Sequence, residues 1–225
     1  MKNKLKKILN SIDTVLYDFD GIIVDSEYYF YLSYNKAFKK RGHSIKKEEY
    51  WIYFTSLGIG VPSEVERYNL GFSIEEQKKI YEERKINYSE FCKNGEIKIF
   101  PEIKKIINYF FENNYKSSIA SNSFENDVFE ILKHNNLNIK NIVGRKNGLR
   151  SKPEPDIFIY ASGMLKSNPE NCLVIEDAEK GLNAAKKIGM KCIIIKNKYN
   201  QNIDFSKADL VFNSHKDFLS FLTQN

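Results

Sequence analysis

The chain has few cysteines, few prolines and no long apolar run. Its 225 residues include 3 cysteines and 5 prolines, and no apolar run approaches the roughly 20 residues that cross a bilayer. The cysteines lack CxxC spacing, and Cys172 and Cys192 begin apolar runs, where a thiol usually acts as a small hydrophobic group. Lysines precede Ile8, but the polar residues of 10–13 interrupt any signal-peptide pattern. We therefore expect a cytoplasmic protein without disulfides, secretion signal or membrane anchor.

The overall composition is that of a globular protein. Hydrophobic residues make up 42% of the chain and charged residues 28%. The 35 basic and 29 acidic side chains give a net charge of +6, spread along the sequence. No nucleic-acid-binding motif accompanies the basic pairs Lys46-Lys47 and Arg145-Lys146. The length suits a core domain with a smaller insert, and we expect a monomer or weak dimer without a nucleic-acid or membrane partner.

Short apolar runs rich in β-branched residues alternate with helical patterns. The expected buried strands are 15–17, 118–120, 173–175, 193–195 and 210–212. Apolar residues recur at helical spacing over 102–114, 124–134 and 178–188. Ser123 is suited to cap the second of these helices, and Gly189 to end the third. This alternation indicates an α/β fold with a parallel sheet covered by helices on both faces.

One long interval lacks any strand pattern. Between Ser26 and about Gly95 the sequence shows only helical patterns, such as Tyr28 to Lys40 and Ile74 to Tyr88. The interval is too long for a crossover connection and too apolar for a linker. We expect residues 27–95 to form an inserted helical domain, with the aromatic residues at its start mostly in its own core, and residues 1–26 and 96–225 to form the main domain.

The first expected strand ends in a cluster of acidic residues. Asp18-Phe19-Asp20-Gly21 follows it directly, and Asp25-Ser26 comes shortly after. Ligands of open α/β sheets bind beyond the carboxyl ends of the strands. Two carboxylates so close together repel each other unless a cation or a proton neutralises them, and Mg²⁺ is commonly held by one or two carboxylates together with phosphate. The alternative is a turn in which the aspartates cap local backbone groups, and the pair alone does not decide between the two.

Three further segments place polar groups at the same expected edge. Glu176-Asp177 follows the strand 173–175 and would complete a metal site, although Asp177 could also cap the next helix. Ser121-Asn122 ends the strand 118–120 at a helix start, which suits either anion binding or capping. Lys152 lies in a loop stiffened by two prolines, where its ammonium could hold a phosphoryl group, whereas a loop lysine taken alone is usually exposed.

Together these segments resemble the four ordered motifs of the haloacid dehalogenase superfamily. The matching residues are Asp18-Phe19-Asp20-Gly21 with Asp25-Ser26, then Ser121, then Lys152-Pro153-Glu154-Pro155-Asp156, then Glu176-Asp177 with Gly181, Ala184-Ala185 and Gly189-Met190. Each motif is weak alone, but four in order over nearly the whole chain are a specific pattern. The insert resembles the helical cap of the β-phosphoglucomutase and phosphoglycolate phosphatase branch. The resemblance implies a Rossmann-like core.

The resemblance also implies a function. The chain would be a magnesium-dependent phosphatase that hydrolyses a small phosphomonoester, such as a sugar phosphate. Asp18 would be the nucleophile that forms an aspartyl-phosphate, and Asp20 the general acid and then the general base. The implied ligands of Mg²⁺ are Asp18, the Asp20 backbone carbonyl, Asp177 and Glu176. The residues implied to bind the phosphoryl group are Ser121, Lys152 and Asn122.

Individual residues separate the branches of this superfamily. Haloacid dehalogenases proper and phosphonoacetaldehyde hydrolases lack the second aspartate of the first motif, so Asp20 argues against both chemistries. β-Phosphoglucomutases carry a histidine where this chain has Phe30, and a cap arginine that the loop Gly58 to Glu64 lacks, although Arg67 lies close by. A phosphatase is therefore favoured over a sugar phosphate mutase. A non-catalytic binding protein on the same fold stays open, because a fold does not imply an activity.

Two further expectations concern residues outside the motifs. His43, His134 and His215 are scattered, form no ligand cluster, and are expected at the surface or in the insert. Substrate specificity is expected in the insert, around Tyr28 and the turn-rich segment 55–64.

Overall fold

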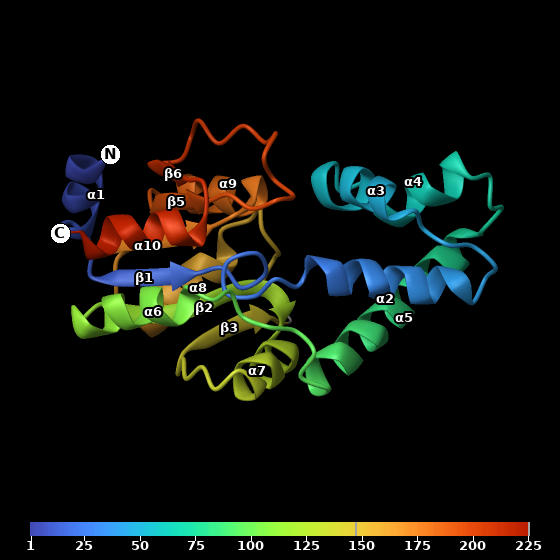
Figure 1. Cartoon of the computed structure of the whole chain (residues 1–225), viewed down its shortest axis with the longest axis horizontal. Coiled ribbons are helices and arrows are strands. Elements are labelled where there is room, and N and C mark those ends of the chain that lie inside the picture. Colours follow the sequence, from blue (N-terminus) through green and yellow to red (C-terminus); the bar gives the residue numbers. More distant parts are fainter. Residues whose placement is uncertain (147, 225) are drawn as a thin grey trace. The chain divides into compact units, whose positions relative to one another are not determined.

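The computed structural model describes residues 1–146 and 148–224, which form two compact units (Figure 1). The core unit consists of Met1–Asp25 and Lys98–Asn225, and the helical unit consists of Ser26–Ile97. The helical unit is therefore a continuous insertion into the sequence of the core unit.

The core unit is built on a parallel sheet with the strand order β3-β2-β1-β4-β5-β6. The strands are β1 (Thr14–Tyr17), β2 (Lys116–Phe124), β3 (Ile142–Arg145), β4 (Cys172–Glu176), β5 (Lys191–Ile195) and β6 (Leu210–Phe212). Every residue of β1 and β4 is buried, as expected for apolar strands covered on both faces. Tyr17 at the end of β1 pairs with Ile119 and Ile175, so the residues that follow come to one edge of the sheet. The expected α/β fold is confirmed.

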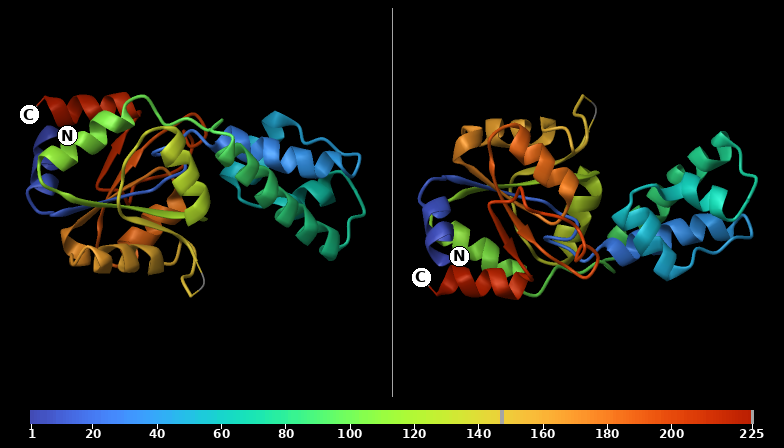
Figure 2. Two further views of the ribbon diagram at one scale, coloured as in Figure 1. Left: turned by 90° about the horizontal axis from the view of Figure 1, so that it is seen from below. Right: turned by 90° about the horizontal axis from the view of Figure 1, so that it is seen from above.

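Helices cover both faces of the sheet (Figure 2). The helices of the core unit are α1 (Lys2–Leu9), α6 (Ile103–Glu112), α7 (Glu125–His134), α8 (Asp156–Met164), α9 (Glu179–Lys187) and α10 (His215–Thr223), with the 3₁₀-helix η2 (Pro169–Asn171) before β4. Helices α8 and α9 bury Phe158 and Leu182 against one face. On the other face, Phe110 of α6 has ring contacts with Tyr17 and with Phe218 of α10. This two-sided burial holds β1 and the residues that follow it in place.

Local differences from the expected elements have simple physical causes. The sequence patterns do not predict strand β3, because it is an edge strand of only four residues and one of them is Gly144, which favours strands poorly. The expected capping role of Ser123 is wrong: α7 begins after Phe124, and the Ser123 hydroxyl donates to Asp20 instead. Gly189 does follow the end of α9, with φ at +76°.

The helical unit contains α2 (Glu27–Lys39), α3 (Lys47–Tyr50), the π-helix η1 (Trp51–Ser56), α4 (Gly60–Arg67) and α5 (Ile74–Lys93). No strand occurs in Ser26–Ile97 as the structure describes it. Helix α5 begins with a capping box, in which Ser73 and Glu76 each accept a hydrogen bond from the other's backbone N–H. The aromatic residues Phe30, Tyr31 and Tyr34 of α2 pack against the apolar core of this unit, as expected. Among the described helices of both units, none has the length and apolar character to span a membrane.

Candidate active site

The candidate site lies at the carboxyl edge of the sheet, where β1 and β4 end. Asp18 follows β1 directly, and its backbone N–H donates to the Ile175 carbonyl of β4 at 2.9 Å. Glu176 is the last residue of β4, and Asp177 follows it. Parallel strands that pair in register end at the same edge, so their terminal acidic residues are neighbours although about 160 residues separate them in the sequence.

Lys152 enters this acidic group from the loop before α8. Its ammonium donates to Asp18 Oδ1 at 2.6 Å and to Glu176 Oε1 at 2.8 Å, and only 4% of the residue is exposed. Its backbone N–H donates to Asn122 Oδ1 at 3.1 Å, which fixes the loop to the end of β2. The lysine is thus a buried, positioned cation that bridges two carboxylates.

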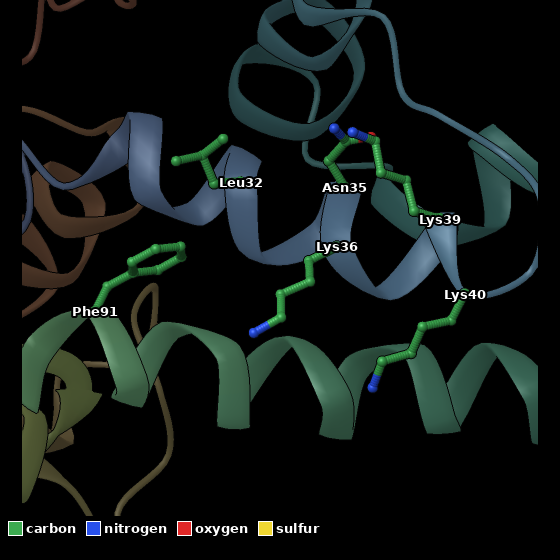
Figure 3. Close-up of a pocket in the computed structure, with 6 residues that line it drawn as sticks. All are labelled: Leu32, Asn35, Lys36, Lys39, Lys40 and Phe91. Atoms are coloured by element: carbon green, nitrogen blue, oxygen red, sulfur yellow. The ribbon is translucent and has the colours of Figure 1, made fainter.

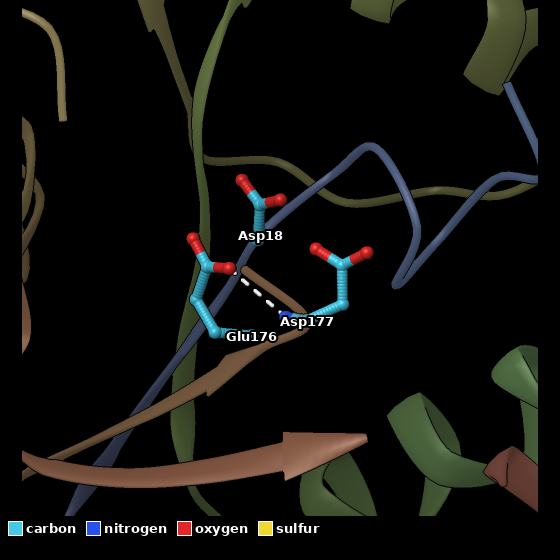
Figure 4. A group of neighbouring side chains, drawn as sticks. All are labelled: Asp18, Glu176 and Asp177. Atoms are coloured by element: carbon cyan, nitrogen blue, oxygen red, sulfur yellow. Dashed lines mark hydrogen bonds between the residues drawn. The ribbon is translucent and has the colours of Figure 1, made fainter. Parts of the chain in front are cut away.

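Figure 4 shows three neighbouring acidic side chains at this edge of the sheet: Asp18, Glu176 and Asp177. Each offers one oxygen, and these oxygens all lie within 4.8 Å of one another. If all three carboxylates are ionised, Lys152 balances only one of their three negative charges. Carboxylate oxygens so arranged fit a hard divalent cation, which prefers oxygen ligands.

Two glycines make the close approach of these carboxylates possible. A Cβ at Gly181 would lie 1.7 Å from Glu176 Oε1, and a Cβ at Gly21 would lie 2.1 Å from Asp177 Oδ2. Gly21 also has a φ of +84°, which favours glycine. Any larger residue at either position would therefore displace one of the acidic side chains.

Burial and crowding change the acidity of the group. Burial raises the pKa of Asp18 to about 7, the charge of Glu176 adds to the rise, and Lys152 opposes it. Burial likewise raises the pKa of Asp177, with Glu176 and Asp18 adding to the rise. Burial alone would lower the pKa of Lys152, but the carboxylates of Asp18 and Glu176 outweigh it and raise that pKa. The lysine is therefore charged at any physiological pH, while the carboxylates are strained by mutual repulsion.

Glu176 is held from two sides. Its Oε1 accepts from Lys152, and its Oε2 accepts from the backbone N–H groups of Asp177 and Ala178, both at 2.9 Å. The alternative role of Asp177, as the cap of α9, is excluded, because Ala178 occupies the N-cap position and Glu176 accepts from the backbone N–H groups of Asp177 and Ala178.

The other expected residues lie around this group with different contacts. Asp20 is half-buried, and its Oδ2 accepts from the Ser123 hydroxyl at 2.5 Å. Ser121 is fully buried in β2, and its hydroxyl oxygen accepts from the Ser123 backbone N–H at 3.0 Å. Asn122 reaches the Lys152 loop, as described above. One hydrogen bond thus joins Asn122 to the Lys152 loop. Two others join Ser121 to Ser123 and Ser123 to Asp20.

Residues that the motifs do not include also contact the acidic group. Asn197 donates from its amide to Asp177 Oδ2 at 2.7 Å, and Asn200 donates to the Asp177 backbone carbonyl at 2.7 Å. Both lie just after β5, so the strand-end rule applied to the run 193–195 could have found them.

The expectation that the histidines lie at the surface or in the insert is wrong for His215. This residue of α10 is buried in the core unit, where its ring stacks on Phe100 and its Nε2 lies 2.7 Å from the Ile22 carbonyl. Ile22 belongs to the segment after the first motif, so His215 supports that segment from outside the acidic group. A single histidine has no sequence pattern that would reveal such a contact.

The helical unit has a groove of its own (Figure 3). Its lining residues are Leu32, Asn35, Lys36 and Lys39 of α2, Lys40 directly after it, and Phe91 of α5. Lys36 pairs with Glu90 at 2.7 Å and Lys40 with Glu83 at 3.3 Å, so much of the positive charge is already balanced. The lining residues of the groove include no carboxylate, and the acidic group of the core unit is the stronger candidate for chemistry.

Comparison with known proteins agrees with the fold and with the motifs. The chain is 29% identical to a CBBY-like protein of Arabidopsis thaliana, over 88% of this chain and 67% of that protein. It is 23% identical to a phosphorylated carbohydrates phosphatase of Thermotoga maritima, over 81% and 84% of the two chains, and 26% identical to a β-phosphoglucomutase of Bacillus subtilis, over 90% of each.

A solved structure shares the fold, and a family model matches most of the sequence. The crystal structure of a predicted phosphoglycolate phosphatase from Haemophilus somnus superposes with a TM-score of 0.81 at 21% identity, over 93% of this chain and 97% of that one. The model of haloacid dehalogenase-like hydrolases matches residues 15–195. The chain therefore belongs to the haloacid dehalogenase-like hydrolase family.

Proposed function

We propose that the protein is a magnesium-dependent phosphatase that hydrolyses a small phosphomonoester, such as a sugar phosphate, through an aspartyl-phosphate on Asp18. The observation that carries the proposal is the contact of Asp18 with the buried ammonium of Lys152 at 2.6 Å, beside two further carboxylates at the edge of the sheet. Membership of the hydrolase family and a relative named as a phosphatase of phosphorylated carbohydrates support it.

The acidic group would hold the metal. Asp18, Asp177 and the Asp20 backbone carbonyl would supply oxygen ligands. Glu176 would contribute less, because both of its oxygens already accept hydrogen bonds and only Oε1 keeps a lone pair free. Bound there, Mg²⁺ would neutralise the crowded carboxylates and the charge of the phosphate, so that Asp18 stays ionised.

Asp18 would act as the nucleophile. One of its carboxylate oxygens would form a bond to phosphorus while the bond from phosphorus to the ester oxygen breaks. The ammonium of Lys152 has three protons, of which two already bind Asp18 and Glu176. The third N–H would donate a hydrogen bond to a phosphoryl oxygen. This bond would place the phosphate next to the attacking carboxylate and offset the negative charge of the phosphate.

Asp20 would move the protons. It would first donate a proton to the leaving alkoxide, and then accept one from the water that attacks phosphorus and breaks the bond to Asp18. The Ser123 hydroxyl, which donates to Asp20 Oδ2, would hold the carboxyl group in position for both steps. Ser121 and Asn122 would complete the phosphate site at the end of β2, and the helical unit would supply substrate specificity.

The direct test is phosphate release from a panel of phosphomonoesters with and without Mg²⁺. We expect release only with Mg²⁺, and loss of at least about a hundredfold in Lys152→Ala, because a charge-stabilising donor is removed. Lys187→Ala is the matched control, since Lys187 is an exposed lysine paired with Glu154. A folded protein without turnover on the whole panel would favour the binding protein instead.

A second candidate is a sugar phosphate mutase, favoured by the identity of 26% to a β-phosphoglucomutase. A mutase returns the phosphoryl group to a sugar, whereas a phosphatase transfers it to water. Incubation with a sugar monophosphate and a trace of its bisphosphate separates the two. Free phosphate is the result that we expect, and accumulation of an isomeric sugar phosphate would establish the mutase.

A further inference from the structure

The turn after β5 donates hydrogen bonds to one of the acidic residues of the candidate site, Asp177. Asp177 receives two hydrogen bonds from this turn, one on its carboxylate from Asn197 and one on its backbone carbonyl from Asn200, both at 2.7 Å. These are contacts between segments about 20 residues apart, and they reach both the side chain and the main chain of the same residue. The turn therefore controls where Asp177 lies and how its carboxylate is oriented.

The direction of both amide groups follows from their other contacts. The Asn197 Oδ1 accepts from the Tyr199 backbone N–H at 2.9 Å, and the Asn200 Oδ1 accepts from the Asn197 backbone N–H at 2.8 Å. Each amide oxygen is thus used inside the turn, and each amide NH₂ group is directed at Asp177. Reversing either amide would bring two acceptors together and lose two hydrogen bonds, so the arrangement is specific for asparagine-like groups.

Further hydrogen bonds within the turn hold its backbone in place. The Gln201 amide donates to the Asn197 carbonyl at 2.6 Å, and Lys196 donates to the Gln201 carbonyl at 3.0 Å. Asn200 is only 4% exposed. A rigid turn of this kind can hold a side chain that would otherwise rotate away from its neighbours.

The carboxylate of Asp177 requires these hydrogen bonds because the neighbouring carboxylates repel it. The carboxylates of Asp18 and Glu176 lie close by, and in the described part of the chain no hydrogen bond reaches the second oxygen, Oδ1. With Oδ2 engaged by Asn197, the free Oδ1 is the oxygen available for a cation. Groups that orient a metal ligand in this way contribute to affinity although they do not touch the metal.

We propose that Asn197 and Asn200 are positioning residues that pre-orient Asp177 for Mg²⁺. The inference rests on the metal site of the proposed function and adds residues that lie outside its motifs. A role in folding alone would make the two asparagines matter for the melting temperature and not for the affinity of the folded protein for the metal.

The test is calorimetric titration of Mg²⁺ into the chelator-treated protein, without any substrate. We expect Asn197→Ala to weaken Mg²⁺ binding by about 10- to 100-fold. Asn200→Ala should weaken it in the same direction, and Asn202→Ala, an exposed asparagine of the same turn, should leave the dissociation constant within about twofold of the unaltered protein. Asn197 is only half-buried, so its variant keeps the test valid even where Asn200→Ala fails to fold.

Two results would overturn the proposal, and they are distinguishable. An Asn197→Ala protein that is folded and binds Mg²⁺ as tightly as the unaltered protein would reject the positioning role and leave the metal site standing. An unaltered protein that binds no Mg²⁺ at millimolar concentration would reject the metal site itself, and the positioning role with it.

Discussion

Replacing Asp18 by asparagine should remove activity and at the same time make the metal-free protein more stable. The substitution keeps the shape of the side chain and an oxygen that can accept from Lys152, but it removes one of three crowded carboxylates. The same carboxylate is the proposed nucleophile. Stability and activity should therefore change in opposite directions, as in other sites whose charges are arranged for function.

The size of the stability gain follows from the pKa of Asp18. Its pKa rises from an ordinary value of 3.8 to about 7, mainly through burial and then through the charge of Glu176. A shift of about 3 pKa units corresponds to roughly 4 kcal/mol of destabilisation when the carboxyl group is ionised in the folded state. At about 2–4 °C per kcal/mol for a chain of this length, the melting temperature should rise by roughly 8–16 °C at a pH where Asp18 is ionised.

The pH dependence has a definite sign. Because the pKa is raised in the folded state, that state binds more protons than the unfolded chain between about pH 4 and pH 7, and the contribution of Asp18 to stability falls as the pH rises through this window. Below about pH 4 both states are protonated, so the advantage of Asp18→Asn should vanish there. Above about pH 7 the advantage should reach its full value.

The assay is differential scanning calorimetry of both proteins at pH 4 and pH 8 in the presence of a chelator. Asp25→Asn is the control, because Asp25 is a partly exposed carboxylate in an ion pair with Lys198, and its variant should shift the melting temperature by no more than a degree or two. The reasoning would be refuted if Asp18→Asn melted at a lower temperature than the unaltered protein at pH 8. It would also be refuted if the gain in melting temperature over the unaltered protein were the same at both pH values. Substantial phosphate release by Asp18→Asn would refute the nucleophile.

Three further predictions concern other residues of the core unit. Asp20→Ala should lower kcat by about 10²- to 10⁴-fold with little change in the melting temperature, and a loss of only a few-fold would move acid–base catalysis elsewhere. Gly181→Ala should displace Glu176, since the added Cβ would lie 1.7 Å from its Oε1. Mg²⁺ binding and turnover should therefore weaken. Unchanged kinetics would show that the Glu176 side chain adapts. Tyr17→Phe should raise the free energy of unfolding by about 1 kcal/mol in urea titration, because among the described residues none accepts from the buried Tyr17 hydroxyl; a loss of stability would contradict this.

The sheet is the part of the fold that sequence patterns predict best. Runs such as 173–175 and 193–195 are apolar on both sides because helices cover both faces, and such runs are recognisable without any long-range information. Strand β3 is not predicted, because an edge strand of four residues that includes Gly144 carries little of that signal. Its existence depends on pairing with β2, which is a tertiary property.

The candidate site is predictable as far as it depends on strand ends. Asp18, Glu176 and Asp177 follow strands that pair in register, and the carboxyl-edge rule brings them together; their roles in catalysis stay predictions. Residue type alone does not reveal contacts made across the fold. Ser123 resembles a helix cap but donates to Asp20, and Asn197 resembles a turn residue but holds Asp177. Both roles depend on which loops the folded chain brings side by side.

Chemical trapping of the covalent intermediate tests the central claim most directly. Borohydride reduces an aspartyl-phosphate to homoserine, so the protein can be quenched with borohydride during turnover with Mg²⁺ and substrate and then mapped by peptide mass spectrometry. We predict homoserine at position 18, and none when Mg²⁺ or substrate is left out. Turnover accompanied by homoserine at another position, or by no homoserine at all, would contradict an aspartyl-phosphate on Asp18.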